Sequence, residues 1–116
     1  MGQWIEACGT DEISEGAMRS ITLEGKEILL ARASDRFYAA ENRCPHMGAR
    51  LSEGALAGTV VTCPRHGSRF ALTDGKVIEW AKLPPIISKV SKMIRRPRGL
   101  LTFPVKVENG RISVEI

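Results

Sequence analysis

The chain contains only two histidines and three cysteines among its 116 residues. So few cysteines are typical of a protein that stays in a reducing compartment. The sequence also lacks the run of about eighteen apolar residues that a membrane-spanning helix requires. Its first residues carry neither the basic start nor the apolar stretch of a signal peptide. We therefore expect a soluble, cytoplasmic protein with no membrane span.

Catalytic signatures are missing as well. The sequence shows no nucleophile paired with a base, no substrate-binding signature and no motif for a mononuclear iron site. It therefore predicts neither an enzyme nor a small-molecule substrate. Repeats and low-complexity segments are also absent, and 43% of the residues are hydrophobic. A chain of this length and composition is expected to form one domain with its own core.

Short apolar stretches separated by turn residues make up most of the chain. This pattern predicts an all-β fold, an antiparallel sandwich or barrel. The pair Asn109-Gly110 predicts a tight hairpin within residues 101–116. The glycine-rich residues 51–58 are expected to be a loop. The other expected strands cover residues 3–8, 18–23, 28–32, 37–40, 59–62 and 68–72.

One segment near the C-terminus supplies the basic character. Residues 81–100 carry six basic and no acidic groups, although the net charge of the chain is only +4. Apolar residues recur at helical spacing over 86–96, which predicts a short helix that ends before Pro97. We interpret its apolar side as packing on the core, with docking to an acidic partner as the main alternative and docking on a membrane surface as a lesser one. We expect no nucleic-acid partner.

Both histidines and two of the three cysteines gather in two short motifs, Cys44-Pro45-His46 and Cys63-Pro64-Arg65-His66. Each motif offers one thiolate and one imidazole on a loop beside a predicted strand, so together they predict a metal site. A structural zinc site usually has both cysteines on one loop and both histidines close together. The mixed order instead favours a binuclear iron cluster, with two thiolates on one iron and two imidazoles on the other. Cys8 lies apart from the motifs and is interpreted as a buried thiol in the first strand.

The two motifs, extended to Gly48 and to Ser68, resemble the two ligand boxes of the Rieske [2Fe-2S] family. The similarity to soluble Rieske ferredoxins continues over nearly the whole chain. It implies a single Rieske domain, with an all-β base of residues 1–40 and 81–116 and a small cluster-binding subdomain inserted at about 41–80. The resemblance also implies one [2Fe-2S] cluster per chain, and its expected ligands are Cys44, His46, Cys63 and His66.

Departures from the respiratory branch of the family bear on the reduction potential. In that branch a disulfide joins the two loops, whereas the matching positions here are Ala49 and Arg65. Ser68 resembles a serine that donates to a bridging sulfide, but Phe70 replaces a tyrosine that donates to a cysteine sulfur. Losing a hydrogen bond to the cluster destabilises its more negative reduced state, so we predict a potential in the lower half of the roughly −150 to +300 mV Rieske range. We also expect three further residues beside the cluster: Gly48, Gly67 and Pro84.

The resemblance implies a one-electron carrier that takes electrons from a reductase and delivers them to a terminal oxygenase or similar enzyme. The alternative is a small Rieske-type subunit of a larger redox enzyme, such as an assimilatory nitrite reductase. A zinc-bound interaction module is a third reading and would be colourless. Four arginines in or beside the motifs are candidates for docking an acidic redox partner, unless they are ordinary solvated side chains: Arg43, Arg50, Arg65 and Arg69.

Overall fold

The computed structural model describes residues 2–45, 48–65, 67–80 and 99–116. Within them the chain forms antiparallel strands and two short 3-10 helices, so the predicted all-β class is confirmed. No helix in this part of the chain is long and apolar enough to cross a membrane. The helix expected at 86–96 lies outside the described residues.

The elements are β1 (Trp4–Gly9), η1 (Thr10–Glu12), β2 (Met18–Leu23), β3 (Lys26–Ala33), β4 (Arg36–Glu41), η2 (Leu51–Glu53), β5 (Ala55–Ala57), β6 (Val60–Thr62), β7 (Arg69–Ala71), β8 (Val77–Glu79), β9 (Thr102–Phe103), β10 (Val105–Glu108) and β11 (Arg111–Glu115).

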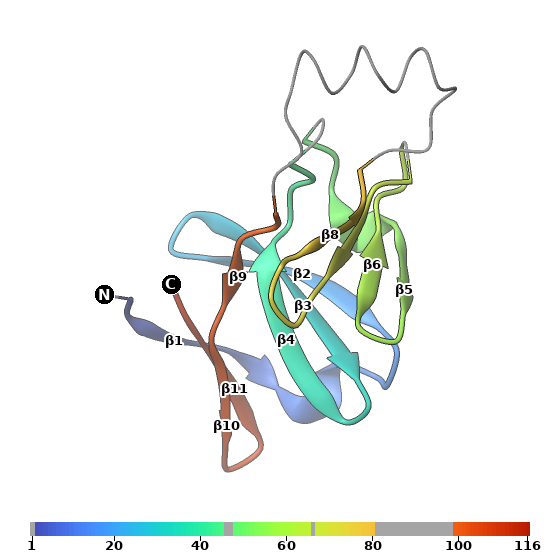
Figure 1. Ribbon diagram of the computed structural model, residues 1–116. Helices are drawn as coiled ribbons and strands as arrows, with labels where there is room; N and C mark the ends of the chain where they lie inside the picture. Colours follow the sequence, from blue (N-terminus) through green and yellow to red (C-terminus); the bar gives the residue numbers. More distant parts are fainter. Residues whose placement is uncertain (1, 46–47, 66, 81–98) are drawn as a thin grey trace, which may run out of the picture.

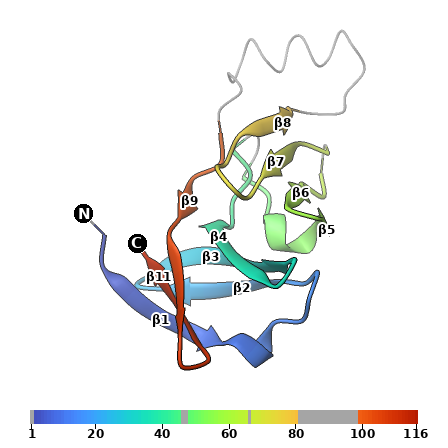
Figure 2. The ribbon, with the colours of Figure 1, turned by 60° about the horizontal axis from the view of Figure 1, so that its bottom comes forward.

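The sheet β2-β3-β4-β9 lies in the middle of the molecule and separates two hydrophobic cores. Figure 2 shows it between the sheet β5-β6-β7-β8 and the sheet β1-β11-β10. Successive side chains of a strand point to opposite faces. In β3, Leu29 and Ala31 therefore enter one core, while Ile28 and Leu30 enter the other. The continuous apolar run of this strand is explained by burial on both faces.

The sheet β1-β11-β10 closes one side of the fold and brings the two termini together (Figure 1). Asn109 and Gly110 have φ angles of 51° and 74° and join β10 to β11, as the sequence predicts. Ile112 is fully buried, but Val107 opposite it on the edge strand is 46% exposed. The apolar side chains of this hairpin are thus buried on β11 and only partly covered on β10.

The sheet β5-β6-β7-β8 is formed entirely by residues that lie between β4 and β9 in the sequence (Figure 1). The flanking strands β4 and β9 pair with each other, with Ala39 opposite Phe103. The chain therefore leaves the central sheet, builds this smaller sheet and returns beside the strand it left. The smaller sheet falls within the expected cluster-binding segment, and the division of the chain into base and subdomain at residues 41 and 80 stays a prediction.

Two strands of the smaller sheet differ from the sequence-based expectation. Residues 55–57 were expected in a loop but form β5, in which Leu56 pairs with Val61. Residues 77–79 form β8 and pair with β7, although no strand is predicted there. Each strand has only three residues, which is too few to show a clear alternation of apolar and polar residues. Each is stabilised by the strand with which it pairs.

Candidate metal centre

Cys44 and Cys63 come from different sheets and meet in one core. Cys44 lies three residues after the end of β4, and Cys63 directly follows β6. Their exposed fractions are 1% and 4%, and both belong to the hydrophobic core that joins the central sheet to the sheet β5-β6-β7-β8. The fold thus brings together the two cysteines that the motifs contain.

The two cysteine loops have the same main-chain hydrogen bonds. The N–H of Cys44 donates to the carbonyl five residues later at 2.7 Å, and its carbonyl accepts from the N–H of Gly48 at 2.8 Å. Cys63 repeats both bonds, with the carbonyl five residues later at 2.7 Å and with the N–H of Gly67 at 3.3 Å. The loops therefore close in the same way, although their histidines follow the cysteines at different spacings.

Each loop turns at its glycine. Gly48 has a φ of 79° and Gly67 a φ of 72°, in the left-handed region that a residue with a side chain adopts at a cost. Glycine is therefore required at these positions for the shape of the loop. The expected place of both glycines beside the cluster stays a prediction.

The described donor atoms fit an iron–sulfur cluster. His46, His66 and Pro84 lie outside the described residues, so the test rests on the cysteines. A bare thiolate is disfavoured in apolar surroundings, and a bound metal ion removes that penalty. Cys44 and Cys63 place two buried sulfur donors in one core, one on each of two matched loops. This arrangement suits two thiolates on one iron of a [2Fe-2S] cluster.

Two fully buried residues follow the second loop. Phe70 packs edge-on against Trp80, with ring centroids 6.5 Å apart and an interplanar angle of 87°. The hydroxyl of Ser68 donates to the main-chain carbonyl of Trp80. The expected donation from this hydroxyl to a bridging sulfide stays a prediction. Trp80 was not predicted beside the loops, because a lone tryptophan in a sequence gives no sign of its neighbours.

Asn42 is a second residue that the sequence analysis did not assign to the site. Together with Ser68 it makes up the buried polar side chains of the described residues, and it is 2% exposed. The available signal was its position two residues before Cys44.

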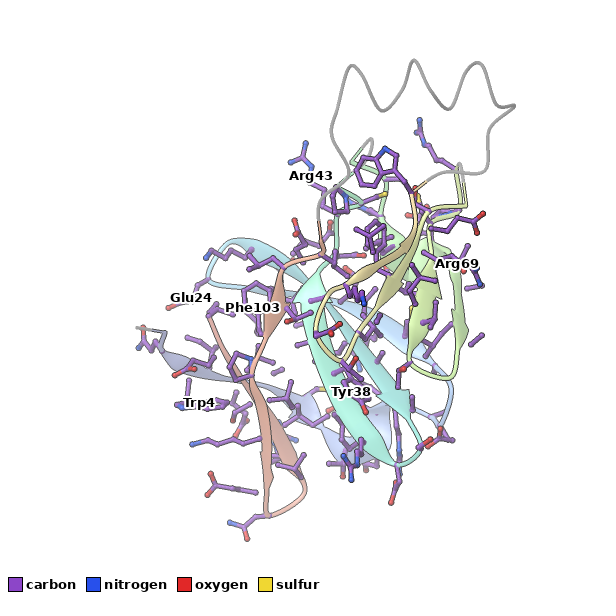
Figure 3. All side chains as sticks on the ribbon, viewed as in Figure 1. Trp4, Glu24, Tyr38, Arg43, Arg69 and Phe103 are labelled. Atoms are coloured by element: carbon purple, nitrogen blue, oxygen red, sulfur yellow. The ribbon has the colours of Figure 1, made fainter. Side chains whose placement is uncertain are left out.

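The four candidate arginines fall into two classes. Arg50 pairs with Glu27 at 3.3 Å, and Arg69 pairs with Glu79 at 3.1 Å. Arg43 and Arg65 are exposed, one on each ligand loop, and form no ion pair with a carboxylate of the described residues. Figure 3 shows Arg43 at the loop end of the molecule, with Trp4 at the base.

Cys8 lies away from the other two cysteines. It is a buried residue of β1, as predicted, and belongs to the core on the opposite face of the central sheet. Burial raises the pKa of its thiol, and the nearby carboxylate of Glu12 raises it further. Cys8 is therefore a neutral thiol in the base and not a ligand of the same centre.

A protein-family model described as the Rieske [2Fe-2S] domain matches residues 3–97. The ferredoxin component of the naphthalene 1,2-dioxygenase system of Pseudomonas putida is 34% identical over 114 residues, which cover 98% of this chain and 96% of the relative. The ferredoxin CarAc of Metapseudomonas resinovorans is 38% identical over 112 residues, covering 96% and 92%.

A solved structure described as the complex of reduced oxygenase and oxidized ferredoxin in carbazole 1,9a-dioxygenase contains a similar chain. The TM-score is 0.78 at 30% identity, and the match covers 97% of this chain and 92% of the matched one. The similarity therefore includes both the fold and the sequence.

Proposed function

Because the chain belongs to the family of Rieske [2Fe-2S] domains, we propose that it is the ferredoxin component of a dioxygenase system. It carries single electrons from a reductase to a terminal oxygenase in the cytoplasm. The observation that carries this proposal is the match with the naphthalene 1,2-dioxygenase ferredoxin component, which runs over 96% of that relative's length.

Four residues hold the [2Fe-2S] cluster in this proposal. Cys44 and Cys63 bind one iron, and His46 and His66 bind the other. When bound, the cluster supplies a one-electron redox couple. The protein excludes water from the cysteine side of the site, because both cysteines lie in a core with fully buried side chains such as Leu51 and Val61.

Arg43 and Arg65 are the docking residues that the geometry favours for an acidic redox partner. Each is exposed on a ligand loop and has no described carboxylate to pair with, so each can form a new ion pair with a partner at little cost. Arg50 and Arg69 must first leave Glu27 and Glu79. The positive charge of the loops also steers an acidic partner toward the cluster end.

Stopped-flow mixing tests the proposed function. The reduced protein is mixed with the oxidised terminal oxygenase of a naphthalene or carbazole dioxygenase system, and the visible absorbance of both partners is followed. We expect one electron to leave each chain in a second-order reaction whose rate falls as ionic strength rises. The absence of transfer to both oxygenases, with co-purification of the chain and a large catalytic subunit, would instead support a subunit of a larger enzyme.

A further inference from the structure

Asn42 lies at the start of the first ligand loop and holds it in place through hydrogen bonds. It directly follows β4, and its main-chain N–H donates to the carbonyl of Glu27 at 3.1 Å, which extends the pairing of β3 with β4 by one residue. Its side chain is 2% exposed. An amide at this depth is stable only when it is hydrogen-bonded.

Ser52 provides both partners of that amide. The Nδ2 of Asn42 donates to the Oγ of Ser52 at 2.8 Å, and the main-chain N–H of Ser52 donates to the Oδ1 of Asn42 at 2.8 Å. This reciprocal pair closes the chain from residue 42 to residue 52. Within this segment lies the hydrogen bond already described, which the N–H of Cys44 donates to the carbonyl of Ala49.

The same pair connects the first loop to the second. Ser52 belongs to η2, whose Leu51 is fully buried in the core that contains both cysteines. After η2 the chain enters β5, and Ala55 of β5 pairs with Thr62, the residue before Cys63. The amide of Asn42 therefore ties the end of β4 to the strand pair that carries the second cysteine.

We infer that Asn42, through its reciprocal hydrogen bonds with Ser52, is a positioning residue that fixes the two cysteine loops relative to each other for cluster binding. A cluster that takes one thiolate from each loop requires the loops to be held at a fixed separation. Residues outside the ligand set that orient metal ligands commonly change metal retention when they are replaced. The inference rests on the proposed ligation by Cys44 and Cys63.

Three substitutions of Asn42 separate hydrogen bonding from packing. Asn42→Asp keeps an oxygen for the N–H of Ser52 and another that accepts from its hydroxyl. Asn42→Leu keeps the branching of the side chain at Cγ and removes both bonds, and Asn42→Ala removes the branch and the bonds together. Ser52→Ala removes one bond of the pair. Ser20→Ala is its matched control, because the hydroxyl of Ser20 makes only an exposed hydrogen bond with Glu27 at 3.3 Å.

The measurements are made on purified holoprotein. The rate of cluster loss to an iron chelator is followed by bleaching of the visible absorbance, the reduced cluster is examined by EPR, and thermal unfolding is recorded for each variant. We expect Asn42→Leu and Asn42→Ala to lose the cluster roughly 10- to 100-fold faster than the wild type, with broadened EPR lines. Ser52→Ala should lose it at an intermediate rate, and Ser20→Ala at nearly the wild-type rate. Asn42→Asp keeps both hydrogen bonds but buries a carboxylate, so it should lose the cluster faster than the wild type and more slowly than Asn42→Leu.

A substitution far from both loops separates the effect of positioning the cysteines from the effect of lowering overall stability. Ile112 is fully buried in the core on the other face of the central sheet, so Ile112→Val lowers the unfolding temperature without touching either loop. The inference is overturned if Asn42→Leu retains the cluster like the wild type, or if Ile112→Val loses it as fast at an equal loss of unfolding temperature. A wild-type protein that binds no cluster would refute the proposed function instead, so the two failures are distinguishable. Should the Asn42 variants fail to fold, Ser52→Ala decides the question, because cluster loss at the wild-type rate in this variant would also overturn the inference.

Discussion

Gly54 lies where the chain that leaves the first ligand loop passes close to the residues on either side of Cys63. A Cβ at this position would overlap the carbonyl oxygen of Thr62 and would also contact Pro64. Both of these residues adjoin Cys63. Glycine is therefore required here for a close approach of backbone to backbone, at a point where any displacement moves a ligand.

Gly54→Ala is expected to destabilise the protein by about 1–3 kcal/mol, because overpacking displaces the surrounding backbone. It should also lower the iron content per chain, since the displacement reaches Cys63. Denaturant unfolding and iron analysis measure the two effects.

Gly58→Ala is the matched control for this substitution. Gly58 has a φ of 60°, and a Cβ added to it would meet no atom within 4 Å beyond its two chain neighbours. Its replacement therefore costs roughly 1–2 kcal/mol of backbone strain and displaces nothing. We expect it to keep the full iron content. Full iron content with unchanged unfolding free energy in Gly54→Ala would contradict the close-approach account.

Arg43 and Arg65 can be compared with Arg50 and Arg69 at equal change of net charge. The double substitution Arg43→Gln/Arg65→Gln should raise the Kd for the terminal oxygenase by roughly 2- to 30-fold more than Arg50→Gln/Arg69→Gln, because each of the two lost ion pairs contributes about 0.2–1 kcal/mol. Both doubles weaken long-range steering alike, since each removes two positive charges. Titration of oxidised oxygenase into the oxidised protein at physiological ionic strength measures the difference without electron transfer. Equal Kd values for the two double variants would show that Arg43 and Arg65 do not belong to the docking surface.

At the scale of elements, η1 is held between the base strands by the carboxylate of Glu12. Its Oε2 accepts from the N–H of Gly9 at 2.7 Å, and its Oε1 accepts from Arg19 at 3.0 Å. These two interactions lower the pKa of Glu12 from its ordinary value of 4.5, the main-chain hydrogen bond contributing most. The ionised carboxylate therefore joins β1, η1 and β2.

A carboxylate whose pKa is lowered by folding stabilises the folded state above its ordinary pKa, and this contribution is lost as pH falls through the folded value. The thermal unfolding temperature of the wild type should therefore fall more steeply below pH 4.5 than that of Glu12→Gln, which should be the less stable protein at pH 7. Glu108→Gln serves as the control, because it removes an exposed carboxylate that pairs with Lys106 at 3.3 Å. Parallel pH profiles for wild type and Glu12→Gln would contradict the role given to Glu12.

Most elements could be predicted from local sequence, and those that could not are explained by their partners. β2 and the β10–β11 turn follow from alternation and from Asn109-Gly110. β5 and β8 were not predicted, because three-residue strands acquire their structure by pairing with β6 and β7. The cysteines were predictable from their motifs, whereas the contacts of Asn42 and Trp80 depend on residues ten or more positions away.

At the scale of the whole molecule, a sheet covered on both faces separates a site-bearing core from a base core. Cys44 and Cys63 belong to the site-bearing core, and Cys8 belongs to the base core. This division explains how one thiol can remain neutral in a chain whose other two thiols are assigned to iron. It also allows substitutions in the base to serve as stability controls for the site.

The reduction potential tests the surroundings of the cluster. Phe70 has no hydroxyl, so the hydrogen bond that a tyrosine would donate to a cysteine sulfur is missing and the more negative reduced state is stabilised less. We predict a midpoint potential below roughly +75 mV, the centre of the Rieske range. A redox titration followed by visible absorbance measures it, and a value near +300 mV would contradict the prediction.

The central claim is that one [2Fe-2S] cluster is bound by two cysteines and two histidines. Pulsed EPR of the reduced wild-type protein tests it most directly, because imidazole ligation couples ¹⁴N nuclei to the unpaired electron and thiolate ligation does not. We predict a signal from one electron per chain, with coupling to two nitrogen nuclei that disappears when both His46 and His66 are replaced by cysteine. A signal without nitrogen coupling, or a colourless zinc protein with no signal at all, would contradict the claim.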